Sequence, residues 1–108
     1  MNNLNSVLIE GNMVRDPLTK VPIGEVEEVC SFTIANNQFF KNKDGELEKE
    51  VSFFAIEAWG KLGEKAMQEG KKGRGCRVVG RLRQDRWNDS EGRPHNCVVI
   101  KAEHIEYR

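Results

Sequence analysis

Residues 50–59 read Glu-Val-Ser-Phe-Phe-Ala-Ile-Glu-Ala-Trp, and this stretch has the pattern of a β-strand. Successive side chains of a β-strand point to opposite faces, so a strand here would have two distinct sides. One side would carry Phe54, Ile56 and Ala58, which we assign to a core. The other would carry Phe53, Ala55, Glu57 and Trp59. Because it includes a charged residue, we expect this second side to face solvent, with two large aromatic rings exposed on it.

The same alternation recurs on both sides of this stretch. Further strands are predicted over residues 4–11, 29–35, 75–87 and 96–105, with Gly11 as a bulge or bend. Residues 61–69 have a helical composition and are followed by Gly70, which predicts one short helix. The element order β-β-β-α-β-β predicts an all-β fold with one short helix, and it matches a five-stranded oligonucleotide-binding barrel, the OB-fold. A length of 108 residues without a visible linker predicts a single domain over residues 1–108.

The charges are unevenly distributed, although 17 basic and 17 acidic residues give a formal net charge of +0. Residues 1–60 carry five cations and ten carboxylates, whereas residues 61–108 carry twelve cations and seven carboxylates. Seven of those cations lie in residues 70–87, where Asp85 is the single acidic residue. This cluster is a candidate phosphate-binding stripe, and the alternative interpretation is a solvated charged face.

Several function classes are disfavoured. The three cysteines, Cys30, Cys76 and Cys97, form no C-x-x-C pair, so we expect reduced, buried, structural thiols in a cytoplasmic protein, and no metal site. No Walker pattern, catalytic triad or cofactor motif is present, so we expect neither an enzyme nor a cofactor. No apolar run is long enough to span a bilayer, and the N-terminus lacks a secretion signal, so no membrane association is expected.

The predicted faces combine aromatic and basic side chains. With the strands over residues 50–59 and 75–87 in one curved sheet, the exposed aromatics share a surface with several arginines. These residues are Phe53, Trp59, Arg77, Arg81, Arg83 and Trp87. Flat rings that stack on bases and cations that hold the backbone are the components of single-strand binding without sequence preference. The alternative is that these rings anchor a protein–protein interface.

An ordered set of short motifs resembles the bacterial single-stranded DNA-binding proteins across nearly the whole chain. The motifs are Asn5-Ser6-Val7-Leu8-Ile9-Glu10-Gly11-Asn12, Arg15-Asp16-Pro17, Phe32-Thr33-Ile34-Ala35, Ala58-Trp59-Gly60-Lys61-Leu62, Lys71-Lys72-Gly73, Gly80-Arg81-Leu82 and Asp85-Arg86-Trp87. The resemblance implies an OB-fold that assembles as a homotetramer, wraps single-stranded DNA, and acts at the nucleoid in replication, recombination and repair.

The resemblance also implies site residues. The stacking positions fall on Phe40, Phe53, Trp59 and Trp87, and Phe39 competes with Phe40 for its role. Phe40 and Phe53 stand where many relatives have Trp, which implies weaker stacking there. The expected phosphate contacts are Lys61, Lys71, Arg81, Arg83 and Arg86.

Family members usually continue into a flexible linker and an acidic tip that recruits replication and repair proteins. This chain ends at Arg108, so we expect either the DNA-binding core of a longer protein or a tailless relative. Two alternative functions remain open: an accessory protein similar to primosomal replication protein N, and a protein-interaction module.

Overall fold

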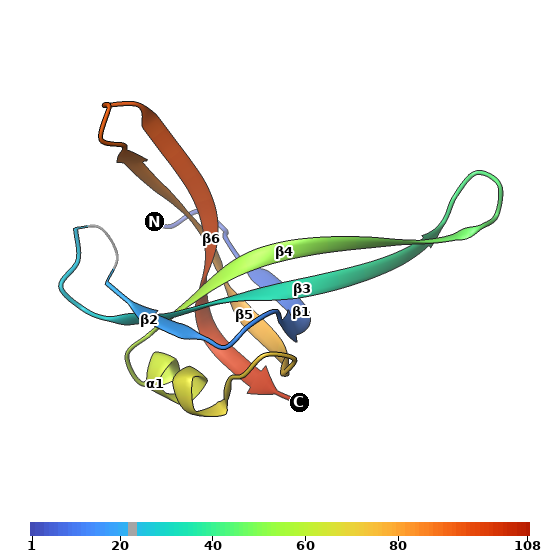
Figure 1. Cartoon of the computed structure of the whole chain (residues 1–108), viewed down its shortest axis with the longest axis horizontal. Helices are drawn as coiled ribbons and strands as arrows, with labels where there is room; N and C mark the ends of the chain where they lie inside the picture. Colours follow the sequence, from blue (N-terminus) through green and yellow to red (C-terminus); the bar gives the residue numbers. More distant parts are fainter. Residues whose placement is uncertain (22–23) are drawn as a thin grey trace.

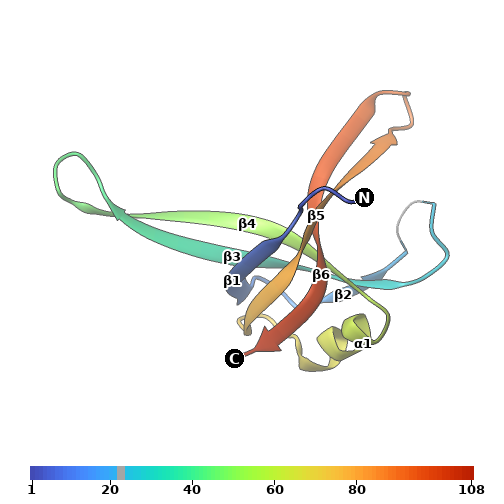
Figure 2. The same ribbon diagram turned by 180° about the vertical axis from the view of Figure 1, so that it is seen from behind.

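The computed structural model describes residues 1–21 and 24–108. Its elements, in chain order, are β1 (Val7–Met13), β2 (Leu18–Lys20), β3 (Val29–Lys41), β4 (Leu47–Trp59), α1 (Gly60–Glu69), β5 (Gly75–Asn88) and β6 (Pro94–Tyr107) (Figures 1 and 2). The predicted order of long strands and helix is confirmed. The short strand β2, which pairs with β3, was not predicted.

The five long strands form a closed ring. Strand β1 pairs with β5 along most of its length and with β3 at its end, where Met13 is opposite Ile34. The pairs β3–β4 and β5–β6 are antiparallel, and β4 and β6 run parallel where Ile56 is opposite Ile100. These pairings close a five-stranded barrel, which confirms the predicted OB-fold.

Two glycines allow the backbones to approach closely in this barrel. A Cβ atom on Gly11 would lie 2.5 Å from the Ala35 carbonyl oxygen, so only glycine lets β1 cross onto β3 at this point. A bulge or bend was expected at Gly11, where β1 keeps a regular register with β5; the bulge lies instead in the β5–β6 ladder, where Val79 is opposite His104 and Gly80 is opposite Ala102, so that Glu103 on β6 is the extra residue. A Cβ atom on Gly80 would lie 2.3 Å from the Lys101 carbonyl oxygen.

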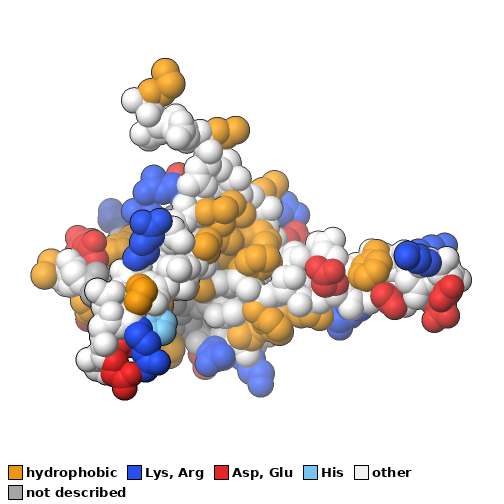
Figure 3. Space-filling model, turned by 90° about the horizontal axis from the view of Figure 1, so that it is seen from above, with side chains coloured by type: hydrophobic (Ala, Val, Ile, Leu, Met, Phe, Trp, Pro, Cys, Tyr) orange, Lys and Arg blue, Asp and Glu red, His pale blue; other side chains and the backbone are white. Residues whose placement is uncertain are grey.

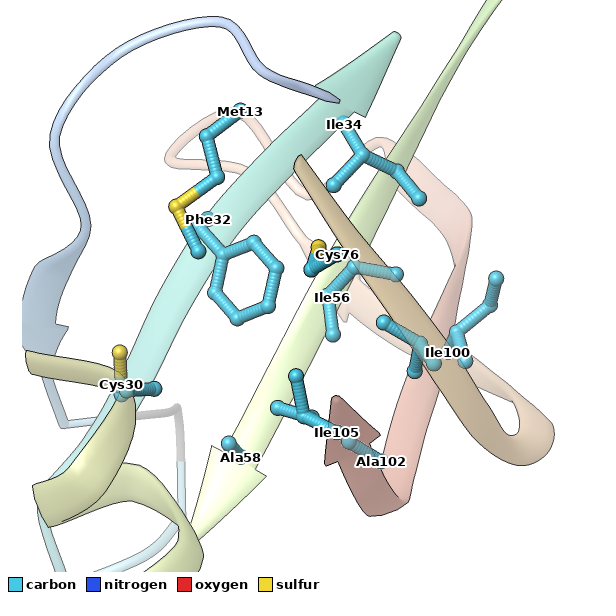
Figure 4. Packing of buried hydrophobic residues seen from close by; sticks show 12 residues of the cluster. Met13, Cys30, Phe32, Ile34, Ile56, Ala58, Cys76, Ile100, Ala102 and Ile105 are labelled. Carbon is cyan, nitrogen blue, oxygen red and sulfur yellow. The ribbon is translucent and has the colours of Figure 1, made fainter. Parts of the chain in front are cut away.

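The core lies inside the ring, and Figure 4 shows its packed side chains. Its buried members include Met13, Cys30, Phe32, Ile34, Ile56, Ala58, Cys76, Val78, Ile100, Ala102 and Ile105. The core face predicted for residues 50–59 is therefore confirmed. Helix α1 packs against one end of the barrel through Gly63 and Ala66, which are buried (Figure 1).

Both long hairpins extend beyond the barrel (Figure 1). Strands β3 and β4 stay paired as far as Lys41 opposite Leu47, six residues past the predicted end of the strand. We call residues 36–52 the arm. At its tip Gly45 has a φ of +78°, and the Asn42 side-chain oxygen accepts bonds from the N–H groups of Asp44 and Glu46. The arm was missed because its side chains are mostly exposed on both faces, so no apolar alternation marks it.

The outer half of the β5–β6 hairpin also leaves the core. Alternation with the buried residues Val78 and Ile100 predicts Leu82 and Val98 on the core face, yet both are exposed, and so is Cys97, which was expected to be buried. These three expectations were wrong because the hairpin continues past the barrel, where neither face is covered. Among the residues that the structure describes, no helix is long and apolar enough to cross a membrane.

Candidate nucleic-acid interface

The strand register places several of the predicted aromatic and basic side chains on one face. Glu57 on β4 is opposite Lys101 on β6, and Lys101 is opposite Arg81 on β5. Directly opposed residues point to the same side of a sheet, so these three side chains form a row across the three strands. Positions two further along, Trp59 on β4 and Arg83 on β5, therefore share this face.

A hollow of about 460 Å³ opens on this face. Its lining is Lys20, Val21, Glu25, Glu57, Trp59, Arg83, Gln84, Asp85, Arg86, Trp87 and Cys97. Two indole rings and three cations thus surround one space, and two of the cations, Arg83 and Arg86, belong to the predicted phosphate contacts. The third, Lys20, was missed because it lies on the unpredicted strand β2.

Glu57 is buried with 1% of its surface exposed, so its expected exposure to solvent was wrong. The Arg83 guanidinium donates a hydrogen bond to its Oε1, and the Lys20 ammonium lies 3.1 Å from its Oε2. The contact between Lys20 and Oε2 is an ion pair, but its geometry is not that of a hydrogen bond. Burial of a carboxylate is costly unless cations compensate for the lost water, and two cations do so here.

Arg83 is held on two sides. Its Nε atom lies 3.0 Å from Asp85 Oδ1, in addition to its bond to Glu57. The Asp85 hydrogen bond raises the pKa of Arg83, and the bond to Glu57 acts in the same direction, while burial opposes both. The guanidinium therefore has two carboxylate partners within the domain itself.

Trp59 is half-buried, and the Lys101 ammonium lies 5.5 Å from its ring centroid. This distance is typical of a cation–π contact. The indole Nε1 is buried and has no hydrogen-bond partner among residues 1–21 and 24–108. Lys101 was not among the predicted contacts, although its alternation with the core residues Ile100 and Ala102 would have placed it on the outer face.

Trp87 stands opposite His95 in the β5–β6 ladder. The two rings are stacked, with centroids 5.6 Å apart and planes 19° apart. His95 Nε2 lies 2.9 Å from Asp89 Oδ2 in the connecting turn. His95 was not among the predicted site residues. The stack could have been found only from the register of the hairpin.

The arm carries the remaining aromatic rings, and Phe39, Phe40 and Phe53 are all exposed. Ala35 is opposite Phe53, and alternation from Ala35 puts Phe39 on the Phe53 side and Phe40 on the other side. A single nucleic-acid strand that contacts both Phe40 and Phe53 must therefore pass around an edge of the arm.

The other predicted cations are dispersed. Arg81 and Arg86 are exposed on β5, and Arg86 Nη2 donates to Gln84 Oε1. Lys61 lies in the first turn of α1 and Lys71 in the turn that follows the helix; neither lines the hollow. Arg77 pairs with Glu10 and Glu106 on the neighbouring strands. Within the described ranges, no cluster of three His, Cys, Asp or Glu side chains could hold a metal ion.

A closed five-stranded barrel with aromatic and basic side chains on one face defines the class of oligonucleotide-binding OB-fold domains. Two solved structures share this fold. "Plasmodium falciparum SSB complex with ssDNA" superposes with a TM-score of 0.84 at 20% identity, covering 100% of this chain and 97% of the other. A deletion mutant of the single-stranded DNA-binding protein from Thermus aquaticus gives 0.81 at 22% identity, covering 97% and 50%.

Sequence comparison then identifies the family. Residues 4–107 match the Single-strand binding protein family. The single-stranded DNA-binding protein of Aquifex aeolicus is 39% identical over 103 residues, which cover 94% of this chain and 68% of the relative. Single-stranded DNA-binding protein 2 of Chlorobaculum tepidum is 30% identical over 107 residues, covering 99% and 72%. The chain belongs to the single-strand binding protein family.

Proposed function

We propose that this chain binds single-stranded DNA without sequence preference along the face that carries the hollow. The observation that carries the proposal is the meeting of Trp59 and Trp87 with Lys20, Arg83 and Arg86 around one space. Stacking on an aromatic ring contributes about 1–3 kcal/mol per base, and each phosphate contact adds a salt-dependent increment. The protein would then coat exposed strands in replication, recombination and repair, by binding and not by catalysis.

The residue roles follow from exposure and place. We assign base stacking to Trp59 and Trp87 at the hollow and to Phe53 and Phe40 on the arm. Arg81 and Arg86 are exposed on the same hairpin as Trp87, which supports their assignment to phosphates. Lys61 and Lys71 would contact the DNA only where the DNA strand continues past the end of the barrel that α1 covers. Arg83 would exchange a carboxylate for a phosphate, or stay with Glu57 and position its neighbours.

Assembly into a homotetramer is part of the proposal. Large apolar side chains are exposed on three barrel strands, at Leu8 on β1, Leu82 on β5 and Val98 on β6. Figure 3 shows apolar side chains gathered in the middle of one face, between the N-terminal segment and the arm. An apolar patch on a soluble domain is typical of a protein–protein contact, and a second copy of the chain is the partner that this family implies.

The test is a titration with oligo-dT at two salt concentrations, followed by tryptophan fluorescence and run beside light scattering. We expect quenching of both indoles, an affinity that falls with salt, and the mass of a tetramer. Trp87→Ala should weaken binding while the mass stays unchanged. A folded protein without quenching at low salt would refute the proposal. Loss of assembly with unchanged DNA affinity would make the rings interface anchors instead.

A further inference from the structure

His95 and Trp87 form a ring pair that the DNA-binding role does not by itself require. The indole is 37% exposed, so part of its surface remains free for a base. It lines the hollow that it shares with Trp59, and it also lines a second hollow of about 330 Å³ together with His95. The imidazole therefore backs an indole that lies on an exposed hairpin.

The imidazole is itself fixed by the turn. The Asp89 carboxylate accepts hydrogen bonds from the N–H groups of Glu91 and Arg93, both at 2.9 Å, and contacts His95 Nε2 at the same distance. The hydrogen bond with His95 is the largest cause that lowers the pKa of Asp89, and the bond from Arg93 adds to it. The carboxylate thus stays ionised throughout the range in which histidine side chains titrate, between about pH 5 and 8.

The other charged groups around His95 have partners of their own. Arg93 pairs with Glu91 and lies 3.5 Å from Asp89, and Arg86 donates to Gln84. A proton on His95 would therefore add a positive charge between the Asp89 carboxylate and the face of the indole. It would make the Asp89 bond charge-assisted and the ring stack a cation–π contact, and both changes strengthen the existing geometry.

We propose that His95 is a positioning residue that holds Trp87 in its stacking orientation, and that protonation of His95 tightens this hold. DNA affinity then increases when His95 gains a proton. The inference rests on the proposed function, because it concerns how one of the proposed stacking rings is oriented. It adds a residue and a pH dependence to that site.

The first test observes the ring pair without DNA. The chain has two tryptophans and two histidines, so Trp59→Phe leaves Trp87 as the only tryptophan, and His104 serves as the matched control. A protonated imidazole in contact with an indole quenches its fluorescence. We expect the emission of the Trp59→Phe variant to fall between pH 8 and 5. Adding His95→Phe should abolish this change, and adding His104→Phe should leave it intact. An unchanged curve with His95→Phe would overturn the proposal.

The second test measures affinity for labelled oligo-dT by anisotropy, with Trp59 intact. Thymine does not titrate between pH 5 and 8, so a pH effect must come from the protein. His95→Ala, which removes the ring, should weaken binding about 2- to 10-fold, the range expected for loss of an aromatic pair. His95→Phe keeps a ring without a proton. It should bind as tightly as the wild type at pH 8 but lose the pH dependence, while His104→Phe keeps it.

Two outcomes of this affinity test would overturn the proposal: His95→Ala binding as tightly as the wild type at every pH, or His95→Phe retaining the full pH dependence. A wild-type protein that does not bind oligo-dT would refute the proposed function instead. In that case the fluorescence titration of the free protein still decides whether His95 holds Trp87.

Discussion

Glu57 on β4 and Arg83 on β5 are joined by an ion pair although β6 lies between their strands. The carboxylate is almost fully buried, and its second cation, Lys20, comes from β2. Side chains from three strands thus join two cations to one buried anion, and this anion lines the same hollow as Trp59 and Trp87. Glu57 thereby partly neutralises two positive charges on the proposed DNA-binding face.

Glu57→Gln should therefore separate stability from binding. The amide keeps the volume but loses the charge, so we expect the free energy of unfolding to fall by about 1–3 kcal/mol. Arg83 and Lys20 become available to phosphates, so affinity for oligo-dT should rise. The plot of log affinity against log salt should steepen by about 0.7 for each additional phosphate that the protein neutralises. Urea unfolding and titrations at several salt concentrations measure these changes.

Glu103→Gln is the matched control for this prediction, because it removes the same charge from an exposed position on β6. If both variants raise the affinity equally and with the same salt slope, the effect is one of overall charge. The ion pair then has no special role in binding.

Substitutions of the aromatic residues on the arm should weaken DNA binding additively. Phe40 and Phe53 lie on opposite sides of it, so Phe40→Ala and Phe53→Ala should each weaken oligo-dT binding by about 1 kcal/mol, at the low end for a stacked base. The double variant should lose about the sum, because the rings share no partner. Phe39→Ala is the control. If it costs more than Phe40→Ala, the stacking role belongs to Phe39, on the Phe53 side.

The Tyr107 hydroxyl should lose its proton only at a high pH. Its hydroxyl is buried without a hydrogen-bond partner among the described residues, and burial raises its pKa to about 12. The folded state therefore keeps a proton that the unfolded state releases near pH 10, so this contribution to stability is lost as the pH rises from about 10 to 12. Ultraviolet absorbance reports the one tyrosine directly. Tyr107→Phe should remove both the signal and its share of the alkaline destabilisation; a midpoint near 10 would contradict the burial.

Thiol reactivity should show whether DNA covers the hollow. Cys97 is exposed and lines it, whereas Cys30 and Cys76 are buried, and burial raises the pKa of Cys30 to about 11. A thiol reagent should modify one cysteine quickly, and saturating oligo-dT should slow that reaction. Cys97→Ser should abolish the fast phase. An unchanged rate with DNA bound would mean that the strand does not pass over this space.

Alternation predicted the parts of the molecule where one face is buried. Ile56 was placed in the core because alternation gives its strand one apolar side, and it is buried. Alternation did not predict the exposure of Leu82 or the extent of the arm, because these strands continue beyond the barrel, where neither side is covered. Glu57 failed because its burial depends on Arg83 and Lys20, which lie on other strands. His95 needed the hairpin register, which the sequence does not specify.

The arm has a further consequence. Apart from Asn42, the side chains of residues 37–51 are exposed, so this segment buries almost nothing in the barrel. Its length and charge can change over evolutionary time with little effect on whether the domain folds. The length of single-stranded DNA that one chain occupies is thus free to diverge among related proteins, while the core stays under its own separate selection.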